Sequence, residues 1–595
     1  SVDIQNITVS IPKDLVKKGS NEFKVETYLR NSDLPCIDDV NTANWITIKG
    51  DSSVKVNFSN ILADNKISNF PYPYLKVNDN VDLGNALVIP DNYTDGELSA
   101  ALLLDSYMSK LYGSSDYNGK IYKYSDAPKN QYINYIFIGN YNSISSEINL
   151  GIDENSSNVI KVIDSPYGSE GSCKLMAIVG NDDNMLIKAV NSLINPDILM
   201  QLNSDIFYID EKLDEKIKES NREDINKVTF KDIGNDEIQL KGPFRRTATV
   251  SYNLPKNKSL VPGDKIKLYM RYSENLDFDR ALVTLYINGT PIGSKKLEKE
   301  KAQNDELELT IPSDINLSNY MDMKIAFDLE MTNSYCEKRQ EEMPWALVTG
   351  DSYIYSAMNN IEDYYFSNYG APFVSDRAYN NTLIVIPDNL SSEDLTAIGG
   401  IFSYLGKDIT YNTGKLQAIR FSNLKGEEKD NNLIIYGTPE NNPLIKSIND
   451  KLWFKYDNEY LKFLSNEKLF LTDPYSSEIT TFQLDKSAFN TQRAMLVLTS
   501  KDENNLRDSL KYLSSSEKLY ELHGDSAVLD KYGNIKTYKF KKDTEKPAYE
   551  KVKELDSNAK GMIILVVLFV LFAVVSLTLF YLKNRKVKDK KIKKK

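Results

Sequence analysis

The strongest hydrophobic pattern in this chain is an uninterrupted apolar run near the C-terminus. Residues 561–582 carry no charge, and a helix of that length would extend about 33 Å at about 1.5 Å per residue. The hydrocarbon core of a bilayer is about 30 Å thick, so the run predicts a transmembrane helix rather than a buried core helix. Residues 583–595 contain nine Lys or Arg against one Asp, which predicts a cytoplasmic tail. We therefore expect a plasma-membrane protein that spans the bilayer once, with residues 1–560 outside the cytoplasm.

Two kinds of apolar pattern alternate along the rest of the chain. Residues 229–360 contain strand-like runs such as TATVSYNLP and DKIKLYMRY, and turn signals such as Asn288-Gly289 divide them. Strands at this spacing, without helical patterns between them, predict an antiparallel β-sandwich of the jelly-roll type. Residues 361–540 alternate continuous apolar runs with helical patterns. That alternation predicts a flavodoxin-like, doubly wound α/β layer.

Both kinds of segment occur twice. Trp45 aligns with Trp345 at an offset of 300, and the neighbouring cysteines align at the same offset. Further along, residues 85–113 align with residues 381–409. Self-similarity over so long a stretch predicts a tandem duplication of a two-part unit of about 300 residues.

Each predicted α/β layer begins with a strand, a turn and a capped helix. Thr94 precedes Glu97 by three residues, and Ser391 precedes Asp394 in the same way, so both pairs predict a capping box. Gly406 is predicted to end the second helix. The turns before the helices read PDNYTDGE and PDNLSSED. They carry acids in place of a phosphate-binding Gly-rich loop, so we expect no flavin or nucleotide there.

The repeat divides the chain into eight predicted segments. The second sandwich opens about 70 residues earlier than the first in the alignment, so we expect the first sandwich to be incomplete at its N-terminal side. In chain order the segments are the C-terminal part of a first jelly roll (1–75), a first flavodoxin-like domain (76–200), a charged linker (201–228), a second jelly roll (229–360), a second flavodoxin-like domain (361–540), a juxtamembrane segment that is either an interfacial helix or a plain spacer (541–560), the transmembrane helix (561–582) and the basic tail (583–595).

The composition argues against an enzyme. The chain has one histidine, His523 in the polar stretch ELHGDS, and three cysteines, Cys36, Cys173 and Cys336, without the spacing of a metal site. We therefore expect no catalytic residue, no metal and no cofactor.

Of a formal net charge of −11, the tail contributes +8, which leaves −19 for residues 1–560. Such a surface repels nucleic acid, so none is expected as a partner.

Several short motifs carry a family resemblance. They are Phe230-x-Asp232-x-Gly234, Leu240-x-Gly242, Tyr272-Ser273-x-x-Leu276, Leu285-x-x-Asn288-Gly289, Ile311-Pro312 and Cys336…Trp345…Asp351-Ser352. With these motifs, the duplicated order and the C-terminal apolar run, the chain resembles the regulatory-subunit family of bacterial cellulose synthase.

The resemblance implies two carbohydrate-binding jelly rolls that alternate with two flavodoxin-like domains, and a function in cellulose biosynthesis, exopolysaccharide secretion and biofilm formation. Such a protein is not itself a glycosyltransferase. Its membrane helix supports the cellulose synthase catalytic subunit, and its extracytoplasmic part guides the nascent β-1,4-glucan. The family is also associated with cyclic di-GMP. We expect that nucleotide to bind the catalytic partner, because the cytoplasmic tail here has no arginine-rich motif beyond Arg585.

The candidate carbohydrate contacts are the three tryptophans, Trp45, Trp345 and Trp453, because the apolar face of a sugar ring stacks on aromatic side chains. Core packing explains the matched pair Trp45 and Trp345 equally well. Two other classes of function stay open from the residues alone. One is a freestanding, surface-anchored carbohydrate-binding protein or adhesin, and the other is an extracytoplasmic hydrolase or flavin protein, which the single histidine and the acidic turns disfavour.

Overall fold

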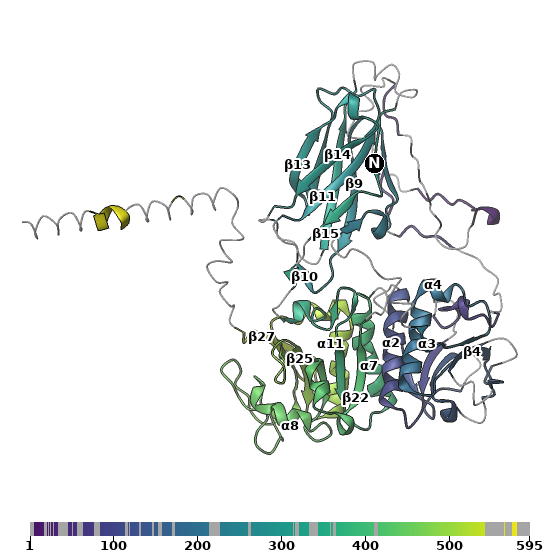
Figure 1. The fold of residues 1–595 in the computed structure, drawn as a ribbon, viewed down its shortest axis with the longest axis vertical. Coiled ribbons are helices and arrows are strands. Elements are labelled where there is room, and N and C mark those ends of the chain that lie inside the picture. The colour runs from purple at the N-terminus through teal and green to yellow at the C-terminus, as the bar shows by residue number, and fades with distance from the viewer. Residues whose placement is uncertain are drawn as a thin grey trace, which may run out of the picture.

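The computed structural model describes residues 5–541 with gaps, together with residue 565 and residues 574–579. The gaps are residues 17–20, 34–45, 50, 56–63, 76–83, 113–116, 118, 130–132, 145–147, 153–157, 169–172, 214–226, 260–262, 313–314, 316–319, 332–342, 357–358, 361–363 and 410–413, and the single positions 22, 24, 26 and 28. In the described part, a β-sandwich stands above two α/β modules that lie side by side (Figure 1).

The β-sandwich consists of two antiparallel sheets around one apolar core. Its strands alternate buried and exposed residues, as in β11, because each sheet has one face on the core and one on solvent. The turn Asn288-Gly289 has positive φ at both residues (46° and 84°) and joins β12 to β13, as its sequence predicts. The strands are β7 (Lys227–Thr229), β8 (Glu237–Lys241), β9 (Phe244–Asn253), β11 (Lys265–Tyr272), β12 (Leu282–Ile287), β13 (Thr290–Lys296), β14 (Asp305–Thr310), β15 (Tyr320–Leu329), β16 (Trp345–Thr349) and β17 (Tyr353–Tyr355).

The first α/β module, formed by described residues from 64 to 213, has one mixed sheet in the order β2-β1-β3-β5-β4-β6. Strands β2, β1, β3 and β5 are parallel, and β4 runs antiparallel to both of its neighbours. The elements are β1 (Gly84–Ile89), α2 (Asp95–Tyr112), β2 (Ile121–Lys123), β3 (Ile133–Gly139), β4 (Val159–Asp164), β5 (Lys174–Val179), α3 (Asp183–Ile194), α4 (Pro196–Leu199) and β6 (Ile206–Tyr208).

The second α/β module, residues 364–541 as described, repeats this order as β22-β21-β23-β25-β24-β26 and adds β27 at the edge. The equal topology agrees with the predicted duplication. The elements are β19 (Val374–Ser375), β20 (Ala378–Tyr379), β21 (Thr382–Ile386), α7 (Ser392–Gly406), β22 (Leu416–Arg420), β23 (Asn432–Gly437), α8 (Leu444–Ile448), β24 (Thr480–Lys486), β25 (Ala494–Ser500), α10 (Glu503–Ser509), α11 (Lys511–Ser514), α12 (Ser516–Leu519), β26 (Ser526–Leu529) and β27 (Ile535–Tyr538).

The predicted helix caps are present. Thr94 Oγ1 accepts a hydrogen bond from Glu97 N (3.1 Å), and the Glu97 carboxylate accepts one from Thr94 N (2.7 Å). Ser391 and Asp394 form the corresponding capping box, and α7 ends at Gly406.

The sheet of the first module differs from a doubly wound layer, whereas α7 and α8 of the second module pack on opposite faces of their sheet. Helices α2 and α3 of the first module belong to one hydrophobic core, on one face of the sheet. The opposite face is covered by the segments around Ile148, Leu150 and Tyr167, with no α-helix among its described residues. A doubly wound layer carries helices on both faces, so the flavodoxin-like architecture is not confirmed here.

Two predicted boundaries shift. The first sandwich was expected to reach residue 75, but Ile67, Phe70 and Tyr74 are buried in the core of the first α/β module. The linker was expected to start at residue 201, but β6 (Ile206–Tyr208) pairs with β4 in that module's sheet. In both cases apolar side chains are buried in the core of the α/β module, which neither the repeat alignment nor the charged composition of the linker indicated. The partial first sandwich stays a prediction: the described residues between 5 and 55 form only the short turn η1 (Lys13–Leu15).

Most of the predicted transmembrane helix lies outside the described residues. Residue 565 and residues 574–579 are described, and they are helical. Across the described part of the chain, no helix has both the length and the apolar character needed to cross a bilayer.

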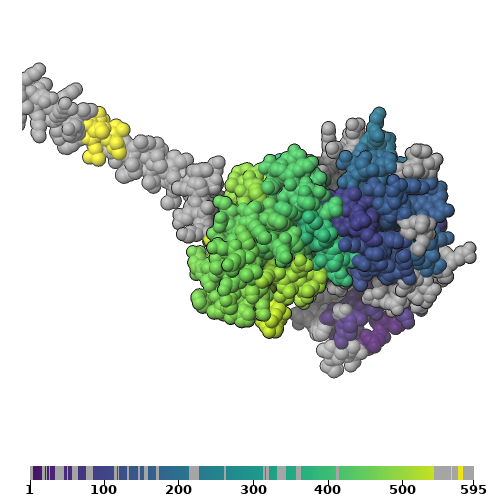
Figure 2. Space-filling model, turned by 90° about the horizontal axis from the view of Figure 1, so that it is seen from below, coloured from purple at the N-terminus to yellow at the C-terminus, as the bar shows by residue number. Residues whose placement is uncertain are grey.

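Helix α2 of the first α/β module packs against α7 of the second, and the two modules abut along this contact (Figures 1 and 2). Residues from Gly96 to Ser109 of α2 are all buried, so this helix is covered on every side. A helix that is buried all round needs partners on all faces. The buried side chains of both helices belong to one hydrophobic core that crosses the module boundary, so neither module is closed without the other.

The contact between the modules is reciprocal. Ser99 Oγ on α2 accepts a hydrogen bond from Ala418 N on β22 (2.8 Å), and Thr396 Oγ1 on α7 accepts one from Ile121 N on β2 (3.1 Å). Corresponding residues are 297 positions apart in both bonds. Each helix thus satisfies an outward backbone amide on the edge strand of the other module. The interface is isologous, like that of a two-fold dimer, although both halves belong to one chain.

A second pair of bonds repeats the pattern one turn earlier on each helix. Ser392 Oγ accepts from Lys123 N (2.9 Å), and Asp95 Oδ1 accepts from Arg420 N (3.3 Å). These residues are again 297 positions apart. Together the bonds occupy amides on one edge strand of each sheet, β2 and β22, which would otherwise be open to pairing with another chain.

Replacing Gly406 with Ala should separate α2 from α7. A Cβ at this position would stand 2.4 Å from the backbone oxygen of Ser106. Overpacking of this kind costs about 1–3 kcal/mol, so we expect the variant to unfold at lower denaturant concentration than the parent chain. The control is Gly426→Ala, where a Cβ meets nothing within 4 Å and no loss is expected. Equal stability of both variants would contradict the close approach of the helices.

The interface also contains a buried carboxyl group, Asp105. Burial raises its pKa to about 6, although the hydroxyl groups of Ser403 and Tyr117 donate hydrogen bonds to it. The folded state therefore holds a proton between about pH 4 and pH 6 that the unfolded chain has released. Stability should fall by about 3 kcal/mol as the pH rises through this window, and stay at the lower value above it. Asp105→Asn should reduce the slope in unfolding midpoints measured from pH 4 to pH 8, and an unchanged slope would contradict the assignment.

Candidate functional site

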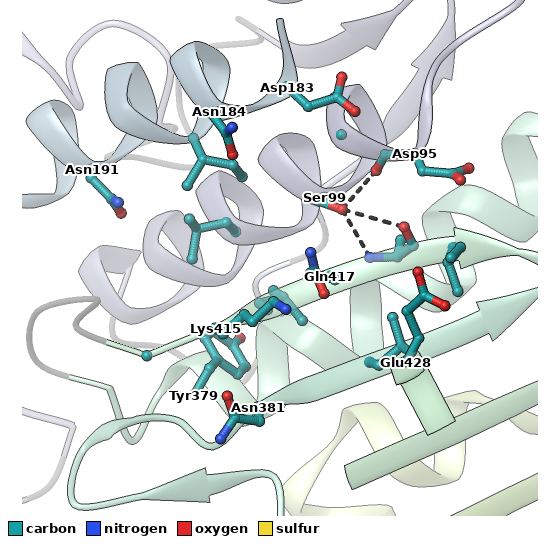
Figure 3. A pocket seen from close by; sticks show the side chains of 18 of the residues that line it. Asp95, Ser99, Asp183, Asn184, Asn191, Tyr379, Asn381, Lys415, Gln417 and Glu428 are labelled. Atoms are coloured by element: carbon teal, nitrogen blue, oxygen red, sulfur yellow. Dashed lines mark hydrogen bonds between the residues drawn. The ribbon is translucent and has the colours of Figure 1, made fainter. Parts of the chain in front are cut away.

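A groove of about 780 Å³ runs between the two α/β modules (Figure 3). Helices α2 and α3 of the first module form one wall, and the edge strand β22 with the segments before β21 and β22 forms the other. We call it the module groove. Its position follows from the reciprocal interface, because the groove opens where α3 leaves the edge of the neighbouring sheet uncovered.

The first wall depends on the close approach of α3 to the beginning of α2. A Cβ on Gly96 would lie 2.0 Å from the carboxyl carbon of Asp183, so only glycine fits there. Thr94 Oγ1 donates a hydrogen bond to Asp183 (2.8 Å), which orients that carboxylate at the rim of the groove. The sequence therefore places an acid and the start of two helices at one end of the groove.

The floor is made by hydrogen bonds between the modules. Ser99 Oγ donates to Asp95 O (2.6 Å; Figure 3). The same oxygen accepts the hydrogen bond from Ala418 N on β22. The Asp95 carboxylate also accepts hydrogen bonds from the side chains of Arg420 (2.8 Å) and Asn423 (2.7 Å). The floor is fixed by both modules, so its shape depends on their interface.

The side chains along the groove are mainly amides, carboxylates and ammonium groups: Asp183, Asn184, Lys188, Asn191, Asn380, Asn381, Lys415, Gln417 and Glu428. These groups donate and accept hydrogen bonds without a large apolar surface. Tyr379 also lines the groove but is buried. Within the part of the chain that the structure describes, no group of three or more His, Cys, Asp or Glu could hold a metal ion. The groove is suited to a ligand that is rich in hydroxyl groups.

The structure does not bring the three candidate tryptophans together. Trp45 lies outside the described residues, Trp345 is half-buried at the start of β16 in the β-sandwich, and Trp453 is half-buried in the second α/β module. Trp345 N donates a hydrogen bond to Ser273 Oγ (3.1 Å), so its backbone belongs to the sandwich framework. Carbohydrate contact at these residues stays a prediction.

Trp453 has a clear structural contact. Its ring stacks on Phe540 with centroids 5.3 Å apart and planes 6° apart. The amide of Trp453 also donates to Gln483 Oε1 (2.9 Å). One face of the indole is therefore occupied by the segment that leads toward the C-terminus.

Lys541 adds further contacts between the segment that contains Phe540 and the second α/β module. Its ammonium group donates hydrogen bonds to the backbone oxygens of Tyr364 (2.9 Å) and Leu484 (3.0 Å) and lies 5.8 Å from the centre of the Trp453 ring. The buried carboxylate of Asp525 accepts hydrogen bonds from the amides of Phe540 (2.9 Å) and Lys541 (2.7 Å). We call these contacts the C-terminal clamp, since they hold the chain at the point from which it continues toward the apolar run.

His523 is exposed in the turn before β26, as expected of a solvated loop histidine.

Sequence reasoning missed the module groove and the C-terminal clamp. The available signal for the groove was the continuous apolar run from Ala100 to Leu104, which covers every face of one turn of α2 and so requires a second partner besides its own sheet. No pattern in the sequence pointed to the pairing of Trp453 with Phe540, which are 87 positions apart.

Three family models match the chain. The model described as "Cellulose synthase BcsB, first FD domain" matches residues 66–204, "Cellulose synthase BcsB, first CBM domain" matches residues 223–360, and "Cellulose synthase BcsB, second FD domain" matches residues 355–516. The matched ranges correspond to the first α/β module, the β-sandwich and most of the second α/β module. The chain therefore belongs to the cellulose synthase BcsB family.

A curated relative is the "Uncharacterized protein YdaN" of Bacillus subtilis (strain 168), which is 21% identical over 473 residues. The match covers 73% of this chain and 62% of the relative, so the chain spans less than two thirds of the relative's length.

Similarity to solved structures is weak. The latent PorU of Porphyromonas gingivalis matches with 11% identity and a TM-score of 0.13, over 20% of this chain and 13% of that one. An acetyl xylan esterase (Est2A) of the rumen bacterium Butyrivibrio proteoclasticus matches with 14% identity and a TM-score of 0.13, over 27% of this chain and 36% of that one. At such scores neither match bears on the fold.

Replacing Trp453 with Ala should loosen the C-terminal clamp. Loss of a half-buried aromatic stack costs about 2–3 kcal/mol, and the segment after Lys541 should become more sensitive to limited proteolysis. The matched control is Tyr532→Ala, since Tyr532 is 79% exposed and its removal should change neither property. A Trp453→Ala protein that is cleaved at the parent rate would show that the clamp does not hold this segment.

Proposed function

We propose that this chain is a non-catalytic, membrane-anchored accessory subunit of a bacterial cellulose synthase complex. The observation that carries the proposal is the match of three BcsB domain models to residues 66–204 and 223–516. In this proposal residues 561–582 span the plasma membrane, the tail 583–595 is cytoplasmic, and the α/β modules and β-sandwich stand outside. The catalytic subunit and the nascent β-1,4-glucan are the partners, together with the bilayer.

The proposed work of the membrane segment is to hold the catalytic subunit in an active state. The C-terminal clamp supports this proposal, because Lys541 and Phe540 bind the second α/β module immediately before the connection to residue 561. A protein attached in this way can pass a change in orientation from its membrane segment to its folded part. Cyclic di-GMP, in the same proposal, acts on the catalytic subunit rather than on this chain.

The proposed work of the folded part is to guide the secreted polymer. A β-1,4-glucan presents hydroxyl groups along its edges, and the amides and carboxylates of the module groove can pair with them. The β-sandwich, which matches a CBM domain model, supplies a second surface for carbohydrate. We further propose that the two α/β modules derive from a flavodoxin-like layer without its cofactor, since their turns after β1 and β21 carry acids in place of a phosphate-binding loop.

The test exchanges residues 561–582 for an unrelated apolar helix of equal length. If this segment packs on the catalytic subunit, glucan output by membranes that contain both proteins should fall at least several-fold, while the amount of anchored protein stays constant. Glucan synthesis is measured from a labelled sugar nucleotide donor, and protein by immunoblot. The control replaces only Leu577 and Leu579 with isoleucine, which keeps the apolar length.

Two outcomes would contradict the proposal. Full glucan output without this chain would show that the synthase does not need it. Failure to co-purify with a multi-span glycosyltransferase in mild detergent would favour a freestanding carbohydrate-binding protein or adhesin.

A further inference from the structure

A second cavity, of about 1040 Å³, lies where the β-sandwich meets the α/β modules. Tyr252 and Tyr320 line it from the sandwich, and Arg377, Tyr404 and Tyr520 line it from the second module. We call it the sandwich cleft. It is distinct from the module groove, which lies between the two α/β modules and shares none of these residues.

The sandwich cleft ends at a junction held by polar contacts. Lys256 of the sandwich forms an ion pair with Asp408 (2.7 Å) and lies 4.0 Å from the centre of the Tyr404 ring. Nearby, Asn257 donates to Ser375 Oγ (2.8 Å), and its side-chain oxygen accepts from Asp376 N (3.2 Å). These contacts join the sandwich to the hairpin formed by β19 and β20, so the cleft has a defined end.

More cationic than acidic side chains line the sandwich cleft. Besides the pair of Lys256 and Asp408, its lining contains the cations Lys110, Arg377 and Lys407 and one further acid, Asp232. The Asp232 carboxylate accepts hydrogen bonds from the amide (2.7 Å) and hydroxyl (2.6 Å) of Thr229, three residues earlier. This cluster of cations occurs in a chain whose formal net charge is −11. A cleft with an excess of cations over acids attracts negatively charged ligands.

The surroundings of Lys110 disfavour its charged form. Its ammonium group donates to the backbone oxygen of Ile409. Burial, with a further contribution from the nearby Arg377, lowers its pKa to about 8, although Asp408 acts in the opposite direction. A bound anion would offset both causes, because it adds a negative charge beside two cations.

Arg377 is held in an unfavourable backbone conformation. It has φ 62° and follows Asp376 with φ 50°, and the two residues form the turn between β19 and β20. Asn-Gly is the usual pair in such a turn, because side chains other than Asn, Asp and Gly crowd the backbone at positive φ. A strained residue that lines a cleft suggests a function for its side chain.

Two exposed tyrosines line the cleft from opposite walls. Tyr320 on β15 is 42% exposed, and Tyr520 after α12 is 80% exposed. Large aromatic side chains left in solvent at the mouth of a cavity offer flat surfaces on which sugar rings stack. Because these tyrosines belong to different folded units, the sandwich and the second module must both be folded to form the site.

We propose that the sandwich cleft binds an acidic saccharide, with Arg377 and Lys110 at its negatively charged group and with Tyr320 and Tyr520 at its ring faces. The planar guanidinium group of Arg377 matches a carboxylate or phosphate with two parallel hydrogen bonds. The volume of the cleft is at the upper end of ligand cavities, which suits several sugar residues rather than a lone ion. This site goes beyond the proposed function, for which the polymer is a neutral glucan.

The test uses the full chain in detergent micelles and measures binding by titration calorimetry. The probes are a short oligogalacturonate, a cello-oligosaccharide of the same length and inorganic phosphate. We expect the oligogalacturonate to bind at least about tenfold more tightly than either of the others, and its binding to weaken as salt concentration rises. No polymer synthesis is involved, so this result is independent of whether the chain serves a synthase.

The decisive variant is Arg377→Gly. It removes the charge and relieves the strained turn, but it also removes a hydrogen bond with the Tyr252 hydroxyl, so the melting temperature should stay close to that of the parent while oligogalacturonate affinity falls about tenfold or more. Tyr520→Ala should weaken binding several-fold without loss of fold, since Tyr520 is mostly exposed. Lys468→Gln, an exposed lysine outside the cleft, should bind as the parent does.

Three results would overturn the proposal. They are equal binding of the cello-oligosaccharide, equal binding of phosphate alone, and unchanged oligogalacturonate affinity in the Arg377→Gly variant. The first would assign the cleft to neutral glucan, the second would reduce it to an anion site, and the third would place the acidic ligand elsewhere.

Discussion

The reciprocal contact between α2 and α7 is the interaction on which the rest of this structure depends. Each helix is buried on its own sheet and again on the neighbouring helix, and a hydroxyl oxygen on each accepts a hydrogen bond from the edge strand of the other module. One duplicated unit could not bury such a helix alone. Duplication therefore supplied the second surface that a helix buried on all sides requires. The contact between α2 and α7 does not extend to α3, so a space remains between α3 and the second module, and this space is the module groove.

Much of the fold was predictable from local patterns, and much of the site was not. The strands near Pro90 and Pro387, and the capping boxes at Thr94 and Ser391, follow from short-range rules that the structure bears out. The antiparallel strand β4 and the one-sided placement of α2 and α3 depend on contacts between distant segments, which periodicity does not report. The same limit applies to Trp453, because its partner Phe540 is close only after the second sheet has formed.

Two polar cavities of the molecule lie at its internal boundaries. The module groove is bounded by the two halves of the duplication, and the sandwich cleft is bounded by the β-sandwich and those halves. Boundaries between folded units are where ligand sites usually form, since side chains from separate cores converge there without disturbing either core. The two sites differ in charge and in aromatic content. A protein that accompanies a polymer could use both, one for hydroxyl-rich chain and one for charged substituents.

Hydrogen–deuterium exchange at the amides of Ile121 and Ala418 tests the central claim most directly. Both amides lie on edge strands, where exchange is normally fast, but here the hydroxyls of Thr396 and Ser99 accept their hydrogen bonds. If the two modules form one unit, both amides should exchange only with opening of the module interface and share one protection factor. Rapid exchange at either amide, at the rate of an exposed edge strand, would show that the modules are merely adjacent.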